Sequence, residues 1–78
     1  MNKNDFKQYE IEINKEIGKR LKSLRKSLKV TIRVAAKDLA VSNTQYCKYE
    51  SGENGFSIAK LKLFCTIYDV PTAYFFKQ

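Results

Sequence analysis

Histidine and tryptophan are absent from this 78-residue chain, and it has only one proline and two cysteines. Without histidine, the common zinc-binding spacings are excluded. A disulfide between Cys47 and Cys65 is not expected in a chain of intracellular type. Long apolar runs are also missing, so neither a signal peptide nor a membrane-spanning helix is predicted. We therefore expect a cytoplasmic protein without metal, cofactor, membrane contact or small-molecule ligand, and not an enzyme.

Acidic residues are scarce as well, with 8 against 15 basic residues and a formal net charge of +7. The basic residues are clustered, because the stretch from Lys19 to Lys37 contains no acid at all. A charge of this size and sign favours a polyanionic partner. A basic run alone is equally compatible with an ordinary solvated surface.

Apolar residues recur at helical spacing, which predicts an all-α chain: a compact bundle of about five helices within a single domain spanning residues 1–78. The N-terminal extension, residues 1–12, is either further helix capped by Asn4 or Asp5 or a frayed arm. The predicted helices are 13–28, 32–39, 43–50, 58–68 and 72–76. The predicted core positions of the first and fourth helices are Ile13, Ile17, Leu21, Leu24, Leu28, Ile58, Leu61, Phe64, Cys65 and Tyr68.

The stretch 31–52 has the pattern of two short helices joined by a tight turn. Thr31 is a suitable N-cap for the first helix. Ser42 and Gln45 form a Ser-x-x-Gln capping box at the start of the second helix, whose inward face is marked by Tyr46 and Tyr49. Gly52 suits the left-handed position after the end of that helix. This arrangement is typical of a DNA-reading helix-turn-helix.

Several short motifs, in this order and spacing, resemble the Cro/phage-repressor-type (lambda-repressor-like) helix-turn-helix family of five-helix DNA-binding domains. The resemblance covers about three quarters of the chain. It rests on Ile17-Gly18-Lys19-Arg20-Leu21, Leu24-Arg25, Thr31, Val41-Ser42, Glu50-Ser51-Gly52, Leu61, Phe64, Tyr68-Asp69-Val70 and Tyr74-Phe75-Phe76.

The resemblance implies a role for individual positions. Base edges are expected to be read from the start of the second helix, and backbone phosphates to be bound around it. The expected base contacts are Asn43, Thr44, Gln45 and Lys48, and the expected phosphate contacts are Ser42, Arg33, Lys37 and Asn54. The alternative for Asn43 and Thr44 is an ordinary solvent-facing position. Arg25 and Glu50 match a pair that forms a structural ion pair.

The sequence departs from the family pattern at three positions. Ile32 stands where the family has glutamine, and Val34 stands where it has the glutamate of a capping box. Ala40 replaces the glycine of the turn, and a Cβ in the left-handed conformation costs about 1 kcal/mol. An exposed Ile32 beside the reading helix would also suit a protein contact.

These features predict a sequence-specific double-stranded DNA-binding transcriptional regulator, a small repressor or control protein of phage or mobile-element type. Binding to a palindromic operator favours a homodimer. The candidate dimer contact is Tyr74-Phe75-Phe76, with core capping as the alternative. The alternative function is a protein-binding module on the same scaffold: an antitoxin, an antirepressor or an inhibitor.

Overall fold

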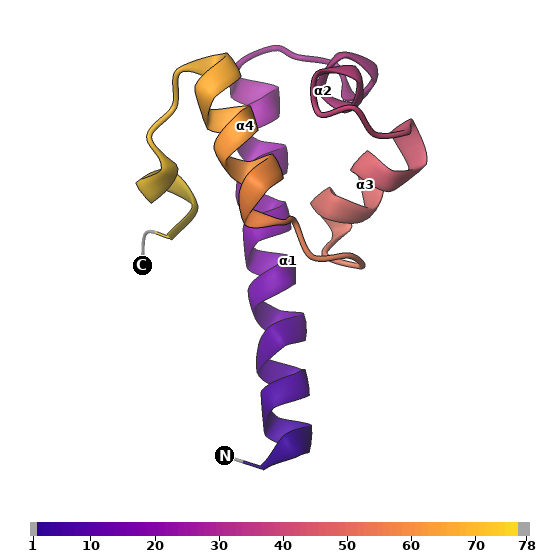
Figure 1. Ribbon diagram of the computed structural model, residues 1–78, viewed down its shortest axis with the longest axis vertical. Coiled ribbons are helices and arrows are strands. Elements are labelled where there is room, and N and C mark those ends of the chain that lie inside the picture. The colour runs from indigo at the N-terminus through magenta and orange to yellow at the C-terminus, as the bar shows by residue number, and fades with distance from the viewer. Residues whose placement is uncertain (1, 77–78) are drawn as a thin grey trace.

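Four α-helices and a closing 3₁₀ helix make up most of the chain in the computed structural model, which describes residues 2–76 (Figure 1). Within these residues there is no β-strand, so the all-α class predicted from the sequence is confirmed. No helix in residues 2–76 combines the length and the apolar character needed to cross a membrane. The elements are α1 (Lys3–Ser27), α2 (Ile32–Asp38), α3 (Asn43–Ser51), α4 (Ile58–Tyr68) and the 3₁₀ helix η1 (Thr72–Phe76).

Helix α1 begins ten residues before the predicted start at residue 13, so residues 3–12 are the further helix that was one of the two alternatives. The predicted boundary at residue 13 and the predicted cap at Asn4 or Asp5 were wrong. Its N-cap is Asn2, whose side chain accepts a hydrogen bond from the Asp5 amide at 3.0 Å. The Asp5 carboxylate accepts from the Asn2 amide in return, at 3.4 Å. This capping box satisfies two backbone amides at the start of the helix. Residues 3–12 contain neither proline nor glycine, so the helix continues without interruption into the predicted first helix.

Helices α1, α2 and α4 each end in a left-handed residue that is not glycine: Lys29, Ala40 and Asp69. In each case the next residue is valine, and its amide donates to the carbonyl five residues earlier. This is the Schellman arrangement, in which a hydrophobic side chain after the helix end packs back onto the core. Val30, Val41 and Val70 do so here. The helix-turn-helix bend at Ala40 is therefore a regular helix end, despite the missing glycine.

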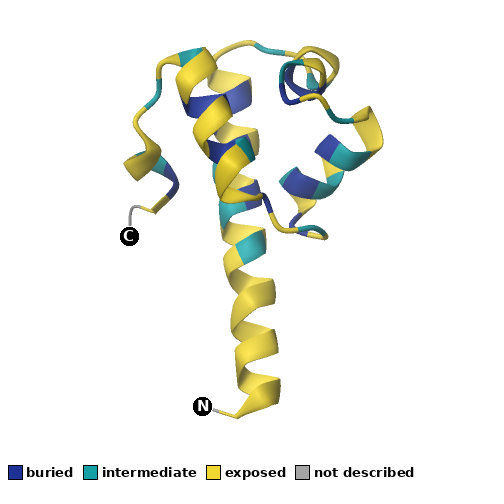
Figure 2. Cartoon of the chain, in the orientation of Figure 1, coloured by how far each residue is buried: buried dark blue, intermediate teal, exposed yellow. Residues whose placement is uncertain are grey.

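The hydrophobic core lies where α1, α2, α3, α4 and η1 meet, above the exposed N-terminal half of α1 (Figure 2). Two ends of the predicted α1 stripe, Ile13 and Leu28, are exposed, because none of the other elements in residues 2–76 covers those turns. Ile58 was also wrongly predicted to be buried, and its side chain is 74% exposed. The buried apolar residues are Leu21, Leu24, Ala35, Ala36, Leu39, Tyr46, Tyr49, Phe56, Leu61, Phe64, Cys65 and Phe75.

Helix α3 packs closely against α1 because α1 has glycine at the crossing point. A Cβ atom at Gly18 would lie 2.4 Å from the Glu50 carbonyl oxygen and 2.5 Å from that of Tyr49. Real Cβ atoms do not approach backbone that closely, so a side chain here would push the two helices apart. Gly18 thus sets the distance at which α3 is held.

Helix α4 holds the end of α2 through two side chains. The Tyr68 hydroxyl donates to the Asp38 carboxylate, and the Lys60 ammonium donates to the Leu39 carbonyl oxygen at 2.6 Å. Burial, and then the hydrogen bond to Asp38, raise the pKa of Tyr68 to about 12. Both contacts fix the residues that immediately precede the turn into α3.

Gly18→Ala should lower the free energy of unfolding by about 2 kcal/mol or more, although alanine is the better helix former by about 1 kcal/mol. The clash with the α3 carbonyl oxygens outweighs helix propensity. The matched control is Gly55→Ala, whose added Cβ would meet only the flexible Asn14 side chain, at 3.3 Å. Urea unfolding of both variants tests this, and equal stability of the two would contradict it.

Tyr68→Phe should lower the free energy of unfolding by about 1–2 kcal/mol at neutral pH, because a hydrogen bond to a carboxylate is lost. The folded pKa is raised, so this stabilisation is complete below the unfolded value of about 10 and disappears as pH rises through about 12. The difference between wild type and variant should therefore shrink over that range. A difference that stays constant in urea titrations from neutral to alkaline pH would refute the assignment.

Candidate nucleic-acid interface

Helix α3 presents a polar face to solvent while two tyrosines anchor its other side. Ser42 caps the helix, and its hydroxyl accepts from the Gln45 amide at 3.0 Å. Tyr46 and Tyr49 are buried in the core. The first two residues of the helix, Asn43 and Thr44, are exposed. The N-terminal end of α3 therefore presents short hydrogen-bonding side chains to solvent.

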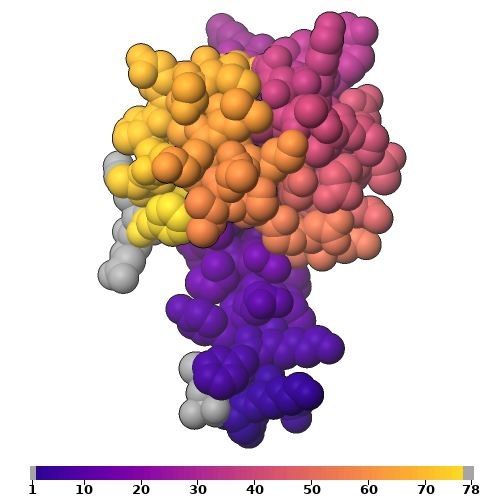
Figure 3. Space-filling model, in the orientation of Figure 1, coloured from indigo at the N-terminus to yellow at the C-terminus, as the bar shows by residue number. Residues whose placement is uncertain are grey.

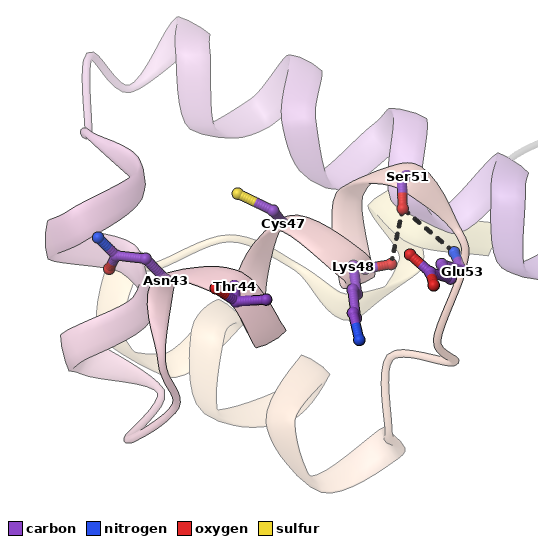
Figure 4. Close-up of a pocket in the computed structure, with 6 residues that line it drawn as sticks. All are labelled: Asn43, Thr44, Cys47, Lys48, Ser51 and Glu53. Atoms are coloured by element: carbon purple, nitrogen blue, oxygen red, sulfur yellow. Dashed lines mark hydrogen bonds between the residues drawn. The ribbon is translucent and has the colours of Figure 1, made fainter.

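An open depression of about 430 Å³ runs along this face (Figure 4). Its floor is formed by consecutive turns of α3, and its far end by the loop that follows the helix. The Ser51 hydroxyl closes that end by donating to the Lys48 carbonyl oxygen at 3.2 Å and accepting from the Glu53 amide at 3.3 Å. The lining residues are Asn43, Thr44, Cys47, Lys48, Ser51 and Glu53.

Gln45, predicted both as a base contact and as half of a capping box, has a different partner. Its side-chain oxygen accepts from the Asn54 side-chain amide at 3.3 Å. The Asn54 backbone amide in turn donates to the Lys48 carbonyl oxygen at 3.2 Å. Only the Ser42 half of the predicted capping box is therefore formed. Gln45 and Asn54 are joined to one another, which fixes the loop after α3 against the helix.

The predicted phosphate contacts on α2, Arg33 and Lys37, are exposed and lie one helical turn apart on the same face. Ile32, which would suit a protein contact if it were exposed, is not exposed. It is half-buried and packs against the core, and it also lines a second depression between α1, α2 and α3. The hydrophobic residue that α2 exposes is Val34.

Two charged residues reach the α3 surface without having been predicted there. Lys22 of α1 lines the second depression together with Cys47 and Ser51. Glu53 lines the first and places a carboxylate at one end of the face. The only sequence signal for Lys22 is that it lies four residues after Gly18, on the side of α1 that faces α3. Glu53 follows the helix end, and its direction depends on the loop.

Arg25 and Glu50, expected from the sequence to pair, form a bidentate ion pair. The Arg25 Nε lies 2.6 Å from one Glu50 carboxylate oxygen, and a second guanidinium nitrogen lies 3.2 Å from the other. The side chains are only 10% and 7% exposed. Arg25 also donates to the Val30 carbonyl oxygen at 3.0 Å. The pair thus links α1, the loop before α2 and the end of α3.

Burial raises the pKa of two groups near these helices. The Tyr46 hydroxyl is buried, and its burial and the neighbouring Glu50 carboxylate raise its pKa. Burial likewise raises the pKa of the Cys65 thiol in α4, which suits a core position. Cys47 is exposed on the face of α3.

The three closing aromatic residues have different environments. Phe75 belongs to the core and is only 2% exposed. It is therefore not accessible to a second copy, and its prediction as a dimer contact was wrong. Tyr74 is half-buried and its ring packs edge-on against Phe75. Phe76 is 62% exposed. The side chain that η1 offers to a partner is therefore mainly Phe76.

A family described as a helix-turn-helix domain matches residues 16–74 of the chain. The match includes α2, α3 and the turn between them, together with α4 and the C-terminal part of α1 from residue 16 onward. No curated protein matches the chain.

Glu50→Gln should lower the free energy of unfolding by about 3 kcal/mol, because it leaves the buried Arg25 charge without its carboxylate. The matched control is Glu53→Gln, which changes the same chemical group on the exposed surface and should shift stability by less than about 0.5 kcal/mol. Thermal or urea unfolding measures both. Similar stability of the two variants would show that the ion pair does not hold α3.

Proposed function

The chain belongs to the helix-turn-helix domain family, and on this premise we propose that it is a sequence-specific double-stranded DNA-binding transcriptional regulator. Within that family we assign it to the Cro/phage-repressor type, as a small cytoplasmic repressor or control protein. One observation supports this most strongly: a polar, accessible helix face that begins with Asn43 and Thr44 and is anchored from behind by Tyr46 and Tyr49.

Base reading is assigned to the first turn of α3. An asparagine side chain can donate to and accept from one adenine at once, and threonine can contact bases by its hydroxyl and methyl groups. Lys48 lies one turn after Thr44 and can reach guanine acceptors. Gln45 takes part only if it exchanges its bond to Asn54 for a bond to a base, so we rank it below Asn43.

Phosphate binding is assigned to groups that flank this turn. The Ser42 hydroxyl and the free amides at the start of α3 suit one phosphate. Arg33 and Lys37 are exposed on α2, and Lys22 of α1 lines the depression between α1, α2 and α3. Because the whole chain has a net charge of +7, long-range attraction to DNA supports the same assignment.

We further propose that two copies bind a palindromic operator, since one domain of this size covers little DNA. Their reading helices would enter major grooves about 34 Å apart. Of the three residues predicted to form the dimer contact, Tyr74, Phe75 and Phe76, only Phe76 has a largely exposed side chain. We therefore propose Phe76 as the dimer contact in η1.

One observation favours the second candidate function, a module that binds a protein. Glu53 places a carboxylate on the α3 face, and Val34 is 43% exposed on α2. An acid and an exposed valine near the reading helix suit a protein surface better than a phosphate backbone. Such a module would show no preference among DNA sequences.

Selection from a random duplex pool, followed by titration at several salt concentrations, tests the DNA function. A palindromic site should emerge, and log affinity should fall linearly with log salt. Asn43→Ala should cost about 1–3 kcal/mol on the selected site and relax preference at one position. Lys37→Ala should weaken all sequences alike and reduce the salt slope by about 1.

The control is Lys7→Ala in the N-terminal half of α1, which also removes one exposed positive charge but lies outside the assigned interface. It should leave base preference unchanged and lower affinity less than Lys37→Ala does. Binding of wild type without any sequence preference would exclude the DNA-reading function and favour the protein-binding module.

A further inference from the structure

The N-terminal part of α1 extends as a single helix beyond the rest of the molecule (Figure 3). We refer to residues 3–13 as the stalk. Every residue of the stalk is exposed, including Phe6 at 60% and Tyr9 at 57%. A solvated helix of this length has little stability by itself, and large aromatic side chains in water add none. An exposed apolar surface of this kind marks an interaction site.

Three of the large apolar residues of the stalk share one face. Phe6, Tyr9 and Ile13 are separated by three and four residues, which places them on one side of the helix. Ile17 follows after four more residues and packs against the core. The stripe is therefore a continuation of the face with which α1 packs against the core. In the stalk, no other part of residues 2–76 covers this face.

The same side of α1 leads to η1. The Arg20 guanidinium donates to the Tyr74 carbonyl oxygen at 3.0 Å, and Arg20 lies seven residues, or two turns, after Ile13. Phe76 of η1 and Ile58 of α4 line a groove of about 290 Å³ there. Their side chains are 62% and 74% exposed. The Arg20–Tyr74 bond thus places η1, which contributes one wall of the groove, beside the side of α1 that carries the stripe.

Charge indicates which partner this surface fits. The stalk has two lysines and three acids, a net charge of −1, whereas the remainder of the chain has a net charge of +8, which together give +7. The stalk has no positive charge in excess that would attract DNA, and two copies repel one another through the remainder of the chain, which is strongly basic. The nearly neutral stalk is where two copies can meet at low electrostatic cost.

We propose that the stripe Phe6–Tyr9–Ile13 and the Ile58–Phe76 groove form the interface with a second copy of this chain. If the exposed parts of these five side chains were covered in both copies, about 1,000 Å² would be buried, which is the lower limit of specific interfaces. Because two-fold pairing presents the same patch from each copy, the stalk of one copy can cover the stripe and the groove of the other.

This inference deepens the homodimer of the proposed function and rests on it for its role, but it is measured without DNA. The stalk supplies a matched pair of positions. Ile13 and Ile11 are 39% and 38% exposed, and they lie on different sides of the same helix because they are two residues apart. The sequence change is the same at both positions, and so is the loss of helix propensity.

Sedimentation equilibrium over a range of concentrations should show a dimer for wild type. Ile13→Glu should raise the dimer dissociation constant by about tenfold or more, because a carboxylate would be buried at the interface. Ile11→Glu should change it by less than about twofold. Tyr9→Glu and Phe76→Ser should behave like Ile13→Glu, with circular dichroism confirming that each variant is folded.

A wild type that stays monomeric throughout overturns the proposal, and so does equal weakening by Ile11→Glu and Ile13→Glu. The two proposals fail separately. If the protein stays monomeric but still selects one duplex sequence, the stalk interface is excluded and the DNA-binding function stands. If it forms a stalk-dependent dimer without any DNA sequence preference, the interface stands and the DNA-binding function is excluded.

Discussion

The close approach of α1 and α3 determines where the polar face of α3 lies. Gly18 removes the side chain that would collide with the carbonyl oxygens of Tyr49 and Glu50. Next to it, Arg25 binds the Glu50 carboxylate in a nearly dry environment, where a charge left alone would be costly. The glycine allows the two helices to approach closely, and the ion pair holds them in this position. The direction of Asn43 and Thr44 follows from both.

The turn before α3 is held from the opposite side by α4. Tyr68 and Lys60 bind the last residues of α2, while Val41 packs onto the core directly after the left-handed Ala40. These contacts explain how alanine is accepted in a left-handed conformation that favours glycine. The cost of its Cβ, about 1 kcal/mol, is offset by a regular Schellman helix end and by two long-range hydrogen bonds. The helix-turn-helix is therefore fixed by the packing around it.

Charge and apolar surface are separated along the length of the molecule. Most of the basic residues lie outside the stalk, which is nearly neutral and has one apolar stripe. Such a separation allows one end to meet a polyanion while the other meets a second copy of the chain, because the two contacts do not compete for the same surface. It also supports the view that α1 has two tasks, as the support of α3 and as the candidate dimer contact.

The sequence by itself determined the helical class and the location of the short helices, because apolar periodicity and capping residues such as Thr31, Ser42 and Ser57 are local signals. It also indicated the residues that α3 exposes, since Tyr46 and Tyr49 mark the opposite face. Periodicity defines a face but not the element that covers it, so Ile13, Leu28 and Ile58 were wrongly predicted to lie in the core. The partners of Gln45, the positions of Lys22 and Glu53, and the difference between Phe75 and Phe76 depend on contacts between distant segments. Only the tertiary structure decided these, because burial and hydrogen bonding belong to pairs of elements and not to any one of them.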